Sequence, residues 1–504
     1  MIANPDRKRH GRRPSISPCS MRTASAMLMI ALPVQSEMSA FRRLPAGLPS
    51  CGWYRVGEGG PWIERAVFIR RTCIHGSAKA ISDFSQAWAF VRRSTIEEVS
   101  MHDRNGFGRK DSLVKAILGM VFTFALGSAA FADSPIRIGV LLPDTGVFAG
   151  LGRDQKDGLK MGFDDFGLEV AGRKIELIEA DTESKPSAGL AQIKKLILRD
   201  KVDIVVGIVS SGVVGAVRNY AHGSKTPLIV TTAGNDRITG DQCSRWIVRA
   251  SFSNSQINRD MGPWLAQRGY KKAFLIAFDY VAGHQMMDTF NRGFTAAGGE
   301  VIGESYPPLG EIRDFGPYLT EIKAAAPDLV YAFFSGGPAI KFVNEWAAFG
   351  MKDEVQLAGP GWLHSALYID KQGEAALGTY SPLNYFPSID TPENKDFQER
   401  FRQRYGRMGS EFGVAAYDSA RLIVSALKKL EGKTDHPEEL MQALLEVEFV
   451  GPRGPFRIDP KTHNVIQNIY VGRIEKQGDA IGAVIKHTFP DVQDPPLGCD
   501  FDEE

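Results

Sequence analysis

The sequence lacks the short motifs that mark the commonest enzyme sites. It has no Gly-x-Ser-x-Gly elbow, which removes support for an esterase, and no Gly-x-x-x-x-Gly-Lys-Ser/Thr loop to hold a nucleotide phosphate. No Gly-x-Gly-x-x-Gly dinucleotide fingerprint follows the first expected strand. Histidines after residue 133 are scattered without the spacing of metal ligands: His222, His284, His364, His436, His463 and His487. The sequence therefore predicts no enzyme, no cofactor and no metal site.

Excess positive charge is also missing from most of the chain. The whole chain carries a formal net charge of +1, but residues 1–100 carry about +8 and residues 133–504 about −9. A negative protein is a poor partner for nucleic acid or for an anionic membrane surface. We therefore expect neither as a partner.

Apolar runs of about 20 residues, long enough to span a membrane, do not occur after residue 133. One shorter run, Ala116–Leu126, lies between a basic segment that starts at Met101 and the small-x-small triplet Ala130–Ala132. This is the pattern of a secretory signal peptide. Because such signals are read at the N-terminus, we expect translation to start at Met101. Cleavage near Ala132 would then release an exported protein that starts near Asp133.

Residues 1–100 have the composition of an upstream extension. They are rich in Arg, Ser and Pro without a sustained period, as expected of a disordered segment or of translated non-coding DNA. Codons for Glu97–Val99 can contain a ribosome-binding sequence just before Met101, which favours that start. An Arg- and Ser-rich mitochondrial-type transit peptide is the alternative, but it leaves the internal signal unexplained.

Cysteine is scarce, with five residues in the chain. Cys19, Cys51 and Cys73 lie in the upstream extension, so only Cys243 and Cys499 remain. Two cysteines in an exported protein favour one disulfide, which would tie the C-terminal tail to the body of the protein. Two unpaired thiols are the alternative.

Strand and helix patterns alternate along residues 136–430. The run Asp203–Val209 is apolar after its first residue, as expected of a central parallel strand covered on both faces. Expected strands span 136–142, 174–180, 203–209 and 227–231, then 272–277, 328–334 and 355–359. Expected helices span 155–166, 187–200, 213–222, 256–267, 283–297, 315–325, 338–349, 394–405 and 415–430.

Repeated strand–helix–strand units predict parallel sheets with helices on both faces. The two series hold too many strands for one ordinary sheet. We therefore predict an α/β fold of two doubly wound lobes, with the chain returning to the first lobe after Tyr385.

Ligands bind such sheets beyond the carboxyl ends of the strands, where helices begin. Ser210-Ser211-Gly212 follows a strand at an expected helix start, so its N–H groups and hydroxyls suit a small carboxylate. Simple N-capping by Ser211 is the alternative. The later loop Ala233-Gly234 either offers further backbone N–H groups or forms an ordinary turn.

Aromatic residues recur in the loops after the strands: Phe148, Phe278, Tyr280, Phe334 and Trp362. Aromatic rings with a few polar groups are typical of a small-molecule cleft. Packing within the lobes is the alternative, and we favour it for Phe278 and Phe334. Phe148 and Trp362 follow glycines in turns, and we expect both to face a cleft.

Several segments, taken in order, resemble the extracytoplasmic solute-binding proteins of ABC importers, in the branched-chain amino acid (Leu/Ile/Val-binding) family. The resemblance extends from about Pro135 to Lys476. It rests on Ile136-Arg-Ile-Gly-Val-Leu-Leu-Pro-Asp-Thr-Gly, on Gly451-Pro-Arg-Gly-Pro-Phe-Arg-Ile-Asp and on segments 152–158, 203–207, 210–212, 226–234, 249–254, 464 and 469–471. It implies a type I periplasmic binding fold, in which two lobes joined by crossing strands close over a ligand.

The resemblance also implies an organisation. A first lobe would comprise 134–251 and 386–448, and a second lobe 252–385 and 449–476, between a signal peptide at 101–132 and a C-terminal tail at 477–504. Such a protein is periplasmic and monomeric, and it delivers its small-molecule ligand to ABC permease subunits at the inner membrane.

Individual residues match the family's ligand positions. Ser210, Ser211, Ala233 and Gly234 match the positions that hold a ligand carboxylate. Tyr280 and the loop of Ser335 match contacts made by the closing lobe, and Phe148 matches a residue that lines the cleft.

One departure concerns the ligand. Amino acid binders place an acid after the strand that here ends at Gly359, to pair with the ligand ammonium, but this loop reads Gly359-Pro-Gly-Trp-Leu-His. An unpaired buried ammonium is costly. We therefore expect an aromatic carboxylate of the benzoate or cinnamate type, with Phe148 and Trp362 against its body and Tyr280 or His364 on any ring hydroxyl.

Other functions of the same fold are alternatives. The protein would bind a branched-chain amino acid, an amide or urea if Asp279 supplied the missing acid. It would be a ligand-sensing protein if it signalled to a regulator instead of feeding a permease. An α/β enzyme is disfavoured by the missing nucleophile and cofactor motifs.

Overall fold

The computed structural model describes residues 134–310 and 312–501, all within one compact unit of the chain. The expected extension at 1–100 and the expected signal peptide at 101–132 lie outside the described residues. Across the described part of the chain, no helix combines the length and apolar character needed to cross a membrane.

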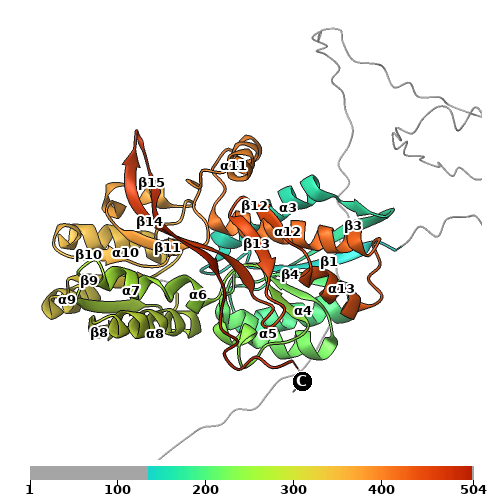
Figure 1. Ribbon diagram of the computed structural model, residues 1–504, viewed down its shortest axis with the longest axis horizontal. Helices are drawn as coiled ribbons and strands as arrows, with labels where there is room; N and C mark the ends of the chain where they lie inside the picture. The colour runs from blue at the N-terminus through green and yellow to red at the C-terminus, as the bar shows by residue number, and fades with distance from the viewer. Residues whose placement is uncertain (1–133, 311, 502–504) are drawn as a thin grey trace, which may run out of the picture. The chain divides into compact units, whose positions relative to one another are not determined.

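The first sheet consists of β1 (Ile136–Leu142), β2 (Glu169–Val170), β3 (Arg173–Asp181), β4 (Ile204–Gly207), β5 (Leu228–Val230) and β6 (Ile247–Arg249). Its spatial order is β2-β3-β1-β4-β5-β6, and all neighbours are parallel except β2 and β3. Helices near this sheet are α3 (Ala149–Phe166), α4 (Pro186–Leu198), α5 (Ser211–Ser224), α12 (Glu411–Lys429) and α13 (Pro437–Leu445) (Figure 1). This sheet and these helices form the first lobe.

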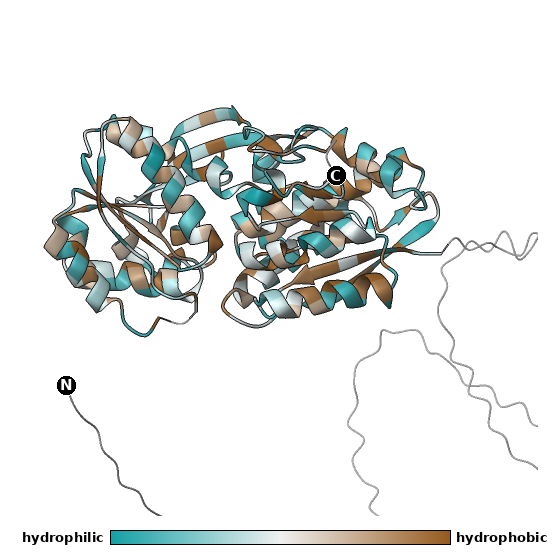
Figure 2. Cartoon of the chain, turned by 90° about the horizontal axis from the view of Figure 1, so that it is seen from below, coloured by the Kyte–Doolittle hydropathy of each residue, from teal (hydrophilic) through white to brown (hydrophobic). Residues whose placement is uncertain are grey.

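Side chains of the first sheet alternate between two buried faces. Ile138 and Val140 of β1 share a hydrophobic cluster with α3 and α12, whereas Leu141 packs with α4 and α5. Strands covered on both faces are apolar throughout, and Figure 2 shows the sheet strands as brown ribbons among helices of mixed polarity.

The second sheet consists of β7 (Lys272–Ala277), β8 (Glu300–Ser305), β9 (Leu329–Phe333), β10 (Gln356–Ala358), β11 (Tyr380–Leu383), β12 (Phe449–Gly451), β13 (Gly454–Ile458), β14 (Val465–Gln477) and β15 (Ala480–Val492). Its order is β12-β13-β14-β11-β10-β9-β7-β8, with β15 paired to β14. Strands β11, β10, β9, β7 and β8 are parallel to one another, and β14 pairs with β11 in the antiparallel direction. With α6 (Asn254–Asn258), α7 (Met261–Ala266), α8 (Val281–Ala296), α9 (Gly316–Ala325) and α10 (Gly337–Ala348), the parallel strands form the second lobe.

Short 3-10 turns occupy several loops: η1 (Asp236–Thr239), η2 (Met351–Asp353), η3 (Gly361–His364), η4 (Ile369–Lys371) and η5 (Gly373–Ala376). The chain passes between the lobes from β6 to α6, from β11 to α11 (Pro392–Tyr405), and along β14 (Figure 1). The predicted fold class, an α/β fold with parallel sheets in two lobes, is confirmed.

Helices α3 and α12 approach each other closely because of glycines. A Cβ on Gly158 of α3 would lie 2.0 Å from the carbonyl oxygen of Gly413, and one on Gly162 would lie 2.7 Å from the Cβ of Ala420. Because these glycines have no side chains, α12 packs closely against α3.

Two helices differ from their expected bounds for identifiable reasons. Helix α3 begins at Ala149 instead of 155, because glycine in its first turn reads as a loop signal. A Cβ at Gly152 would meet the carbonyl oxygen of Pro143, so this turn requires glycine. The helix expected at 256–267 is divided into α6 and α7, since Pro263 has no N–H to donate to the carbonyl of Arg259.

Strands β2, β6, β8 and β11 to β15 were not among the expected strands. The segment expected as a C-terminal tail, 477–504, begins with the 13-residue strand β15. Beyond it, the Sγ atoms of Cys243 and Cys499 lie 2.13 Å apart and form a disulfide. This bond fastens the end of the chain to the first lobe.

We expect Cys499→Ser to lower the free energy of unfolding by about 2–5 kcal/mol, because the bond closes a long loop and restricts the unfolded chain. Thermal melts with and without a reductant measure the effect. The reductant should lower the melting temperature of the wild type only. Equal melting temperatures for both proteins would mean that the bond contributes nothing.

Candidate ligand-binding site

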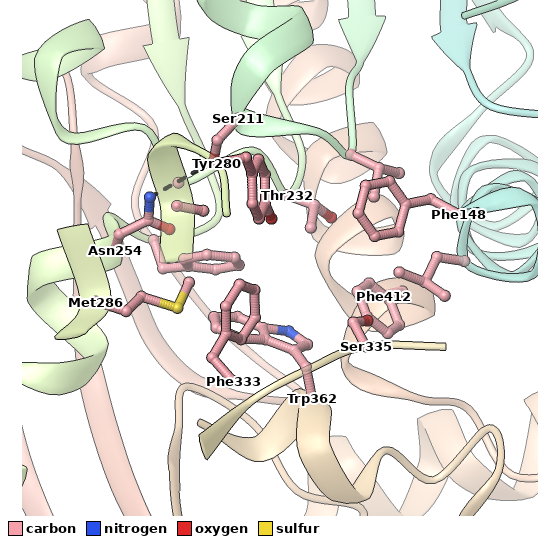
Figure 3. A pocket seen from close by; sticks show the side chains of 15 residues that line it. Phe148, Ser211, Thr232, Asn254, Tyr280, Met286, Phe333, Ser335, Trp362 and Phe412 are labelled. Carbon is pink, nitrogen blue, oxygen red and sulfur yellow. Dashed lines mark hydrogen bonds between the residues drawn. The ribbon is translucent and has the colours of Figure 1, made fainter. Parts of the chain in front are cut away.

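A pocket lies where the loops after the strands of both lobes meet, as expected for open parallel sheets. It encloses about 330 Å³ of space not filled by atoms, part of which is open solvent. Its lining comes from both lobes and from the crossing segment after β6 (Figure 3): Phe148, Leu151, Val209, Ser211, Thr232, Gly234, Phe252, Asn254, Tyr280, Ala282, Met286, Phe333, Ser335, Trp362 and Phe412.

Ser211 opens helix α5 and points into the pocket from the first lobe (Figure 3). The first N–H groups of a helix have no acceptor within the helix, and here the first α5 residue bonded to the preceding turn is Val214, to the carbonyl of Ser210. The Ser211 hydroxyl oxygen receives only a long contact, 3.5 Å from Asn254 Nδ2, so its proton is free to donate to a ligand. A hydroxyl and a helix N-terminus together suit a carboxylate.

Thr232 also lines the pocket, but its hydroxyl is committed. It accepts from Gln155 Nε2 at 2.7 Å and donates its only proton to the carbonyl of Thr231 at 2.8 Å. Thr232 therefore offers a ligand an acceptor and no donor.

Tyr280 brings a neutral phenol from the second lobe. Burial raises its pKa well above the ordinary value, so the hydroxyl keeps its proton at neutral pH. Figure 3 shows this hydroxyl directed into the pocket, where it can donate to a ligand oxygen.

Aromatic rings form much of the wall. The rings of Phe252 and Trp362 have centroids 4.6 Å apart, and Phe333 meets Trp362 edge-on at 6.0 Å. Phe148 and Phe412 face them from the first lobe (Figure 3). A flat apolar ring would therefore meet aromatic surface from both lobes.

Charged side chains are absent from the lining formed by the described residues: no Asp, Glu, Lys, Arg or His takes part. Asp279, the acid that an amino acid binder would need, does not face the pocket. Its side chain is 60% exposed and lies 2.9 Å from His284 Nε2. The condition for the alternative, that Asp279 faces the cleft, is therefore not met, because the backbone turn after β7 directs its side chain to solvent.

Six of the nine expected ligand residues line the pocket: Phe148, Ser211, Gly234, Tyr280, Ser335 and Trp362. The other three do not. Ser210 is the residue before α5 and lies behind its first turn, and the N–H of Ala233 is already used by the carbonyl of Ile208 at 3.0 Å. His364 faces the other side of η3, where its Nδ1 bonds Gln372 Oε1 at 3.0 Å.

The two aromatic residues assigned to the lobe interior are placed as expected. Phe278 and Phe334 are fully buried in the larger hydrophobic cluster.

Three ring positions were missed. Phe333 is the last residue of β9 and lies within the strand expected at 328–334. Phe412 precedes the helix expected at 415–430. Phe252 and Asn254 stand in the crossing segment, within the quoted motif 249–254, but only the folded hinge turns them toward the ligand loops. In the sequence these two residues are marked only by the motif 249–254, to which no role was assigned.

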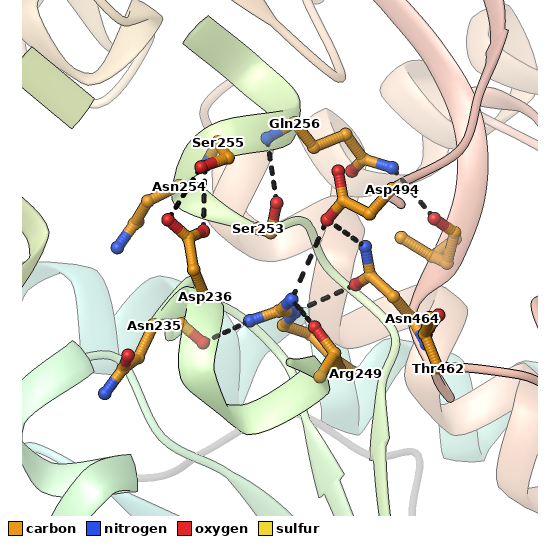
Figure 4. A network of polar contacts seen from close by, with 12 residues as sticks. Asn235, Asp236, Arg249, Ser253, Asn254, Ser255, Gln256, Thr462, Asn464 and Asp494 are labelled. Atoms are coloured by element: carbon orange, nitrogen blue, oxygen red, sulfur yellow. Dashed lines mark hydrogen bonds and ion pairs between the residues drawn. The ribbon is translucent and has the colours of Figure 1, made fainter. Parts of the chain in front are cut away.

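The crossing segment is fixed by a buried arginine (Figure 4). Arg249 Nη1 donates to the carbonyl of Asn235 at 2.6 Å and Nε to Asn464 Oδ1 at 2.8 Å, while Nη2 lies 4.0 Å from Asp494 Oδ2. Burial lowers the pKa of Arg249 to about 10, opposed by Asp494 and Asp236, so the group stays cationic at neutral pH. The network joins the pocket loop to one end of the β14–β15 pair, where Asn464 and Asp494 lie side by side.

Two parallel-sheet lobes with a pocket between them, joined by crossing segments, define a protein that holds a small ligand. Residues 135–479 match the family described as Periplasmic binding protein. The chain is 31% identical over 364 residues to Leu/Ile/Val-binding protein homolog 6 of Brucella melitensis, covering 71% of this chain and 92% of that relative.

Two solved structures are also similar. An ABC transporter solute-binding protein from R. palustris in complex with benzoate is 34% identical, with a TM-score of 0.69, and the match covers 72% of this chain and 99% of that chain. A solute-binding protein from Rhodopseudomonas palustris BisB5 in complex with 3,4-dihydroxybenzoic acid is 32% identical, with the same TM-score and coverage.

The chain belongs to the periplasmic binding protein family and is a solute-binding protein of the branched-chain amino acid ABC type. The resemblance of the sequence is thereby confirmed. Its relatives bind substrates and do not transform them, so the protein is a binding protein and not an enzyme.

Glu411, beside the pocket residue Phe412, gives a prediction about pH. It is buried at the start of α12, and burial raises its pKa to about 8, although the hydroxyl of Ser365 in the second lobe opposes this. A raised pKa means that the folded state binds the proton more tightly than the unfolded state. Stability from this group is full below about pH 4.5 and is lost as the pH rises through about 8.

We therefore expect Glu411→Gln to leave stability near the wild type at low pH and to raise it at pH 9. Urea unfolding of both proteins across this pH range measures the difference. A constant difference at all pH values would show that Glu411 does not titrate as its burial implies.

Proposed function

We propose that this protein captures an aromatic carboxylate of the benzoate or cinnamate type between its lobes and delivers it to an ABC permease. The observation that carries the proposal is the neutral aromatic lining of the pocket, which offers donors for an anion and no charged group. In this arrangement Ser211 and the N–H groups of α5 hold the carboxylate. The ring lies between Phe148 and Trp362, and Tyr280 donates from the second lobe.

This neutral site suits a carboxylate better than it suits a zwitterion. The partial positive charge at a helix N-terminus and oriented donors stabilise an anion. An ammonium group has no carboxylate beside it here, and a buried unpaired cation is strongly disfavoured. The pocket therefore favours an acid with an apolar body over leucine or valine.

The relatives support the same class of ligand. Benzoate and 3,4-dihydroxybenzoic acid occupy solved solute-binding proteins that share about a third of their residues with this chain. We also propose export to the periplasm with cleavage near Ala132, since the segment 101–132 reads as a signal and the family is periplasmic.

The ligand class is tested by thermal melts of the exported chain from Asp133 with benzoate, cinnamate, leucine and valine. A ligand at 100 times its dissociation constant stabilises the folded state by about 2.7 kcal/mol, so the aromatic acids should raise the melting temperature. Leucine and valine should leave it unchanged. A shift with an amino acid alone would overturn the proposal.

The carboxylate position is tested by Ser211→Ala, with Ser210→Ala as the matched control. Loss of one hydrogen bond to a charged group should weaken benzoate binding about tenfold. The control should bind as the wild type does, because Ser210 does not line the pocket. Calorimetric titration measures both affinities, and equal affinities for the two variants would place the carboxylate elsewhere.

A further inference from the structure

Asn254 carries an unpartnered acceptor in the wall of the pocket. This residue opens α6 in the crossing segment, is 1% exposed and lines the pocket. Its side-chain oxygen, Oδ1, is buried and has no hydrogen-bond partner among the described residues. Figure 3 shows the oxygen on the pocket side of the amide and the nitrogen turned away from it.

The orientation of this amide is fixed by a backbone group. Asp236 donates its N–H to Gln285 Oε1 at 3.1 Å, so that oxygen must be an acceptor. Asn254 Nδ2 donates to the same oxygen at 2.8 Å. A flipped Asn254 would place its carbonyl oxygen against the Gln285 oxygen, so Oδ1 is held toward the pocket.

The orientation of the next side-chain amides, Gln285 and Asn235, is fixed as well. Gln285 Nε2 donates to Asn235 Oδ1 at 3.0 Å, and this oxygen also accepts the backbone N–H of Arg237 at 3.2 Å. Asn235 Nδ2 donates to the carbonyl of Ser211 at 3.3 Å. Backbone groups thus determine the orientation of the Gln285 and Asn235 amides. Gln285, in the second lobe, in turn determines the orientation of the Asn254 amide in the hinge.

A buried acceptor without a partner is unfavourable, and a ligand that brings a donor removes that cost. We propose, building on the proposed function, that the ligand is an aromatic carboxylate with a hydroxyl on the carboxylate side of its ring, donated to Asn254 Oδ1. Asn254 is thereby a residue that determines specificity, and benzoate itself is a weaker ligand than a hydroxylated benzoate.

The place of the hydroxyl follows from the short distance between the two polar positions. Asn254 Nδ2 lies 3.5 Å from the Ser211 hydroxyl that contacts the carboxylate, and Oδ1 belongs to the same amide. A Cβ on Gly234 would lie 2.4 Å from Oδ1, so this oxygen stands directly beside the carboxylate loop. A hydroxyl at ring position 2 or 3 meets this requirement, whereas one at position 4 lies at the far end of the ring.

The test is calorimetric titration of the exported chain with benzoate, its 2-, 3- and 4-hydroxy derivatives and 3-methoxybenzoate. The 2- or 3-hydroxy acid should bind about tenfold more tightly than benzoate. The methoxy acid keeps the oxygen but has no proton to donate, so it should show no gain. Equal affinities for benzoate and both hydroxy acids, or a gain only at position 4, would overturn the inference.

Asn254→Leu should abolish the preference, so that benzoate and the 2- and 3-hydroxy acids bind this variant with equal affinity; Gln285 Oε1 keeps its bond from Asp236. Asn291→Leu, on α8 outside the pocket lining, is the matched control and should keep the preference. If Asn254→Leu does not fold, the comparison of hydroxy and methoxy acids on the wild type still decides. Failure of every aromatic acid to bind would refute the proposed function instead.

Discussion

Two buried guanidinium groups hold the segments that cross between the lobes, and the ligand pocket depends on them. Arg453, fully buried, donates Nε to Asp418 of α12 at 2.7 Å, Nη2 to the carbonyl of Ala250 at 2.7 Å and Nη1 to Gln467 of β14 at 3.1 Å. Arg249 likewise forms buried bonds, which join the loop that lines the pocket to the C-terminal part of the chain. Removing one partner of a buried ion pair leaves a charge without compensation, which costs about 3–5 kcal/mol. The crossing segments are therefore fixed relative to one another at the hinge.

This rigid hinge explains the composition of the site. Phe252 lies in the crossing segment after Arg249, and Asn254 opens α6 at the end of that segment. The hinge therefore sets where both residues stand, and Gln285 of the second lobe orients the Asn254 amide. The lobes then add Ser211 from one side and Trp362 from the other. Charge is concentrated in the hinge, while the pocket beside it is neutral. A molecule that enters the pocket consequently meets helix N–H groups and hydroxyls, and no ionic partner in the lining.

Much of the fold was predictable from the sequence, because parallel strands buried on both faces leave continuous apolar runs such as β4 and β9. Ser211 and Trp362 were found because ligand loops follow such strands. The missed residues depend on long-range geometry. Phe412 comes from a helix that reaches the pocket only through its packing on α3, and the edge strands have mixed polarity that no local pattern marks. Ser210, Ala233 and His364 do not line the pocket, since neighbours in a short turn point to opposite sides of it.

Selectivity in a neutral pocket must come from shape and from hydrogen-bond polarity, because no opposite charge distinguishes one ligand from another. Aromatic walls accept any flat ring, and Ser211 with the N-terminus of α5 accepts any carboxylate. Discrimination among such acids is therefore left to acceptors that only some ligands satisfy. The Thr232 hydroxyl donates its proton to the carbonyl of Thr231, and Asn254 is held with its oxygen inward by the side-chain amide of Gln285 in the second lobe. The pocket thus has acceptors close to the hydroxyl of Ser211, and these acceptors penalise a ligand that brings oxygen without hydrogen at that position.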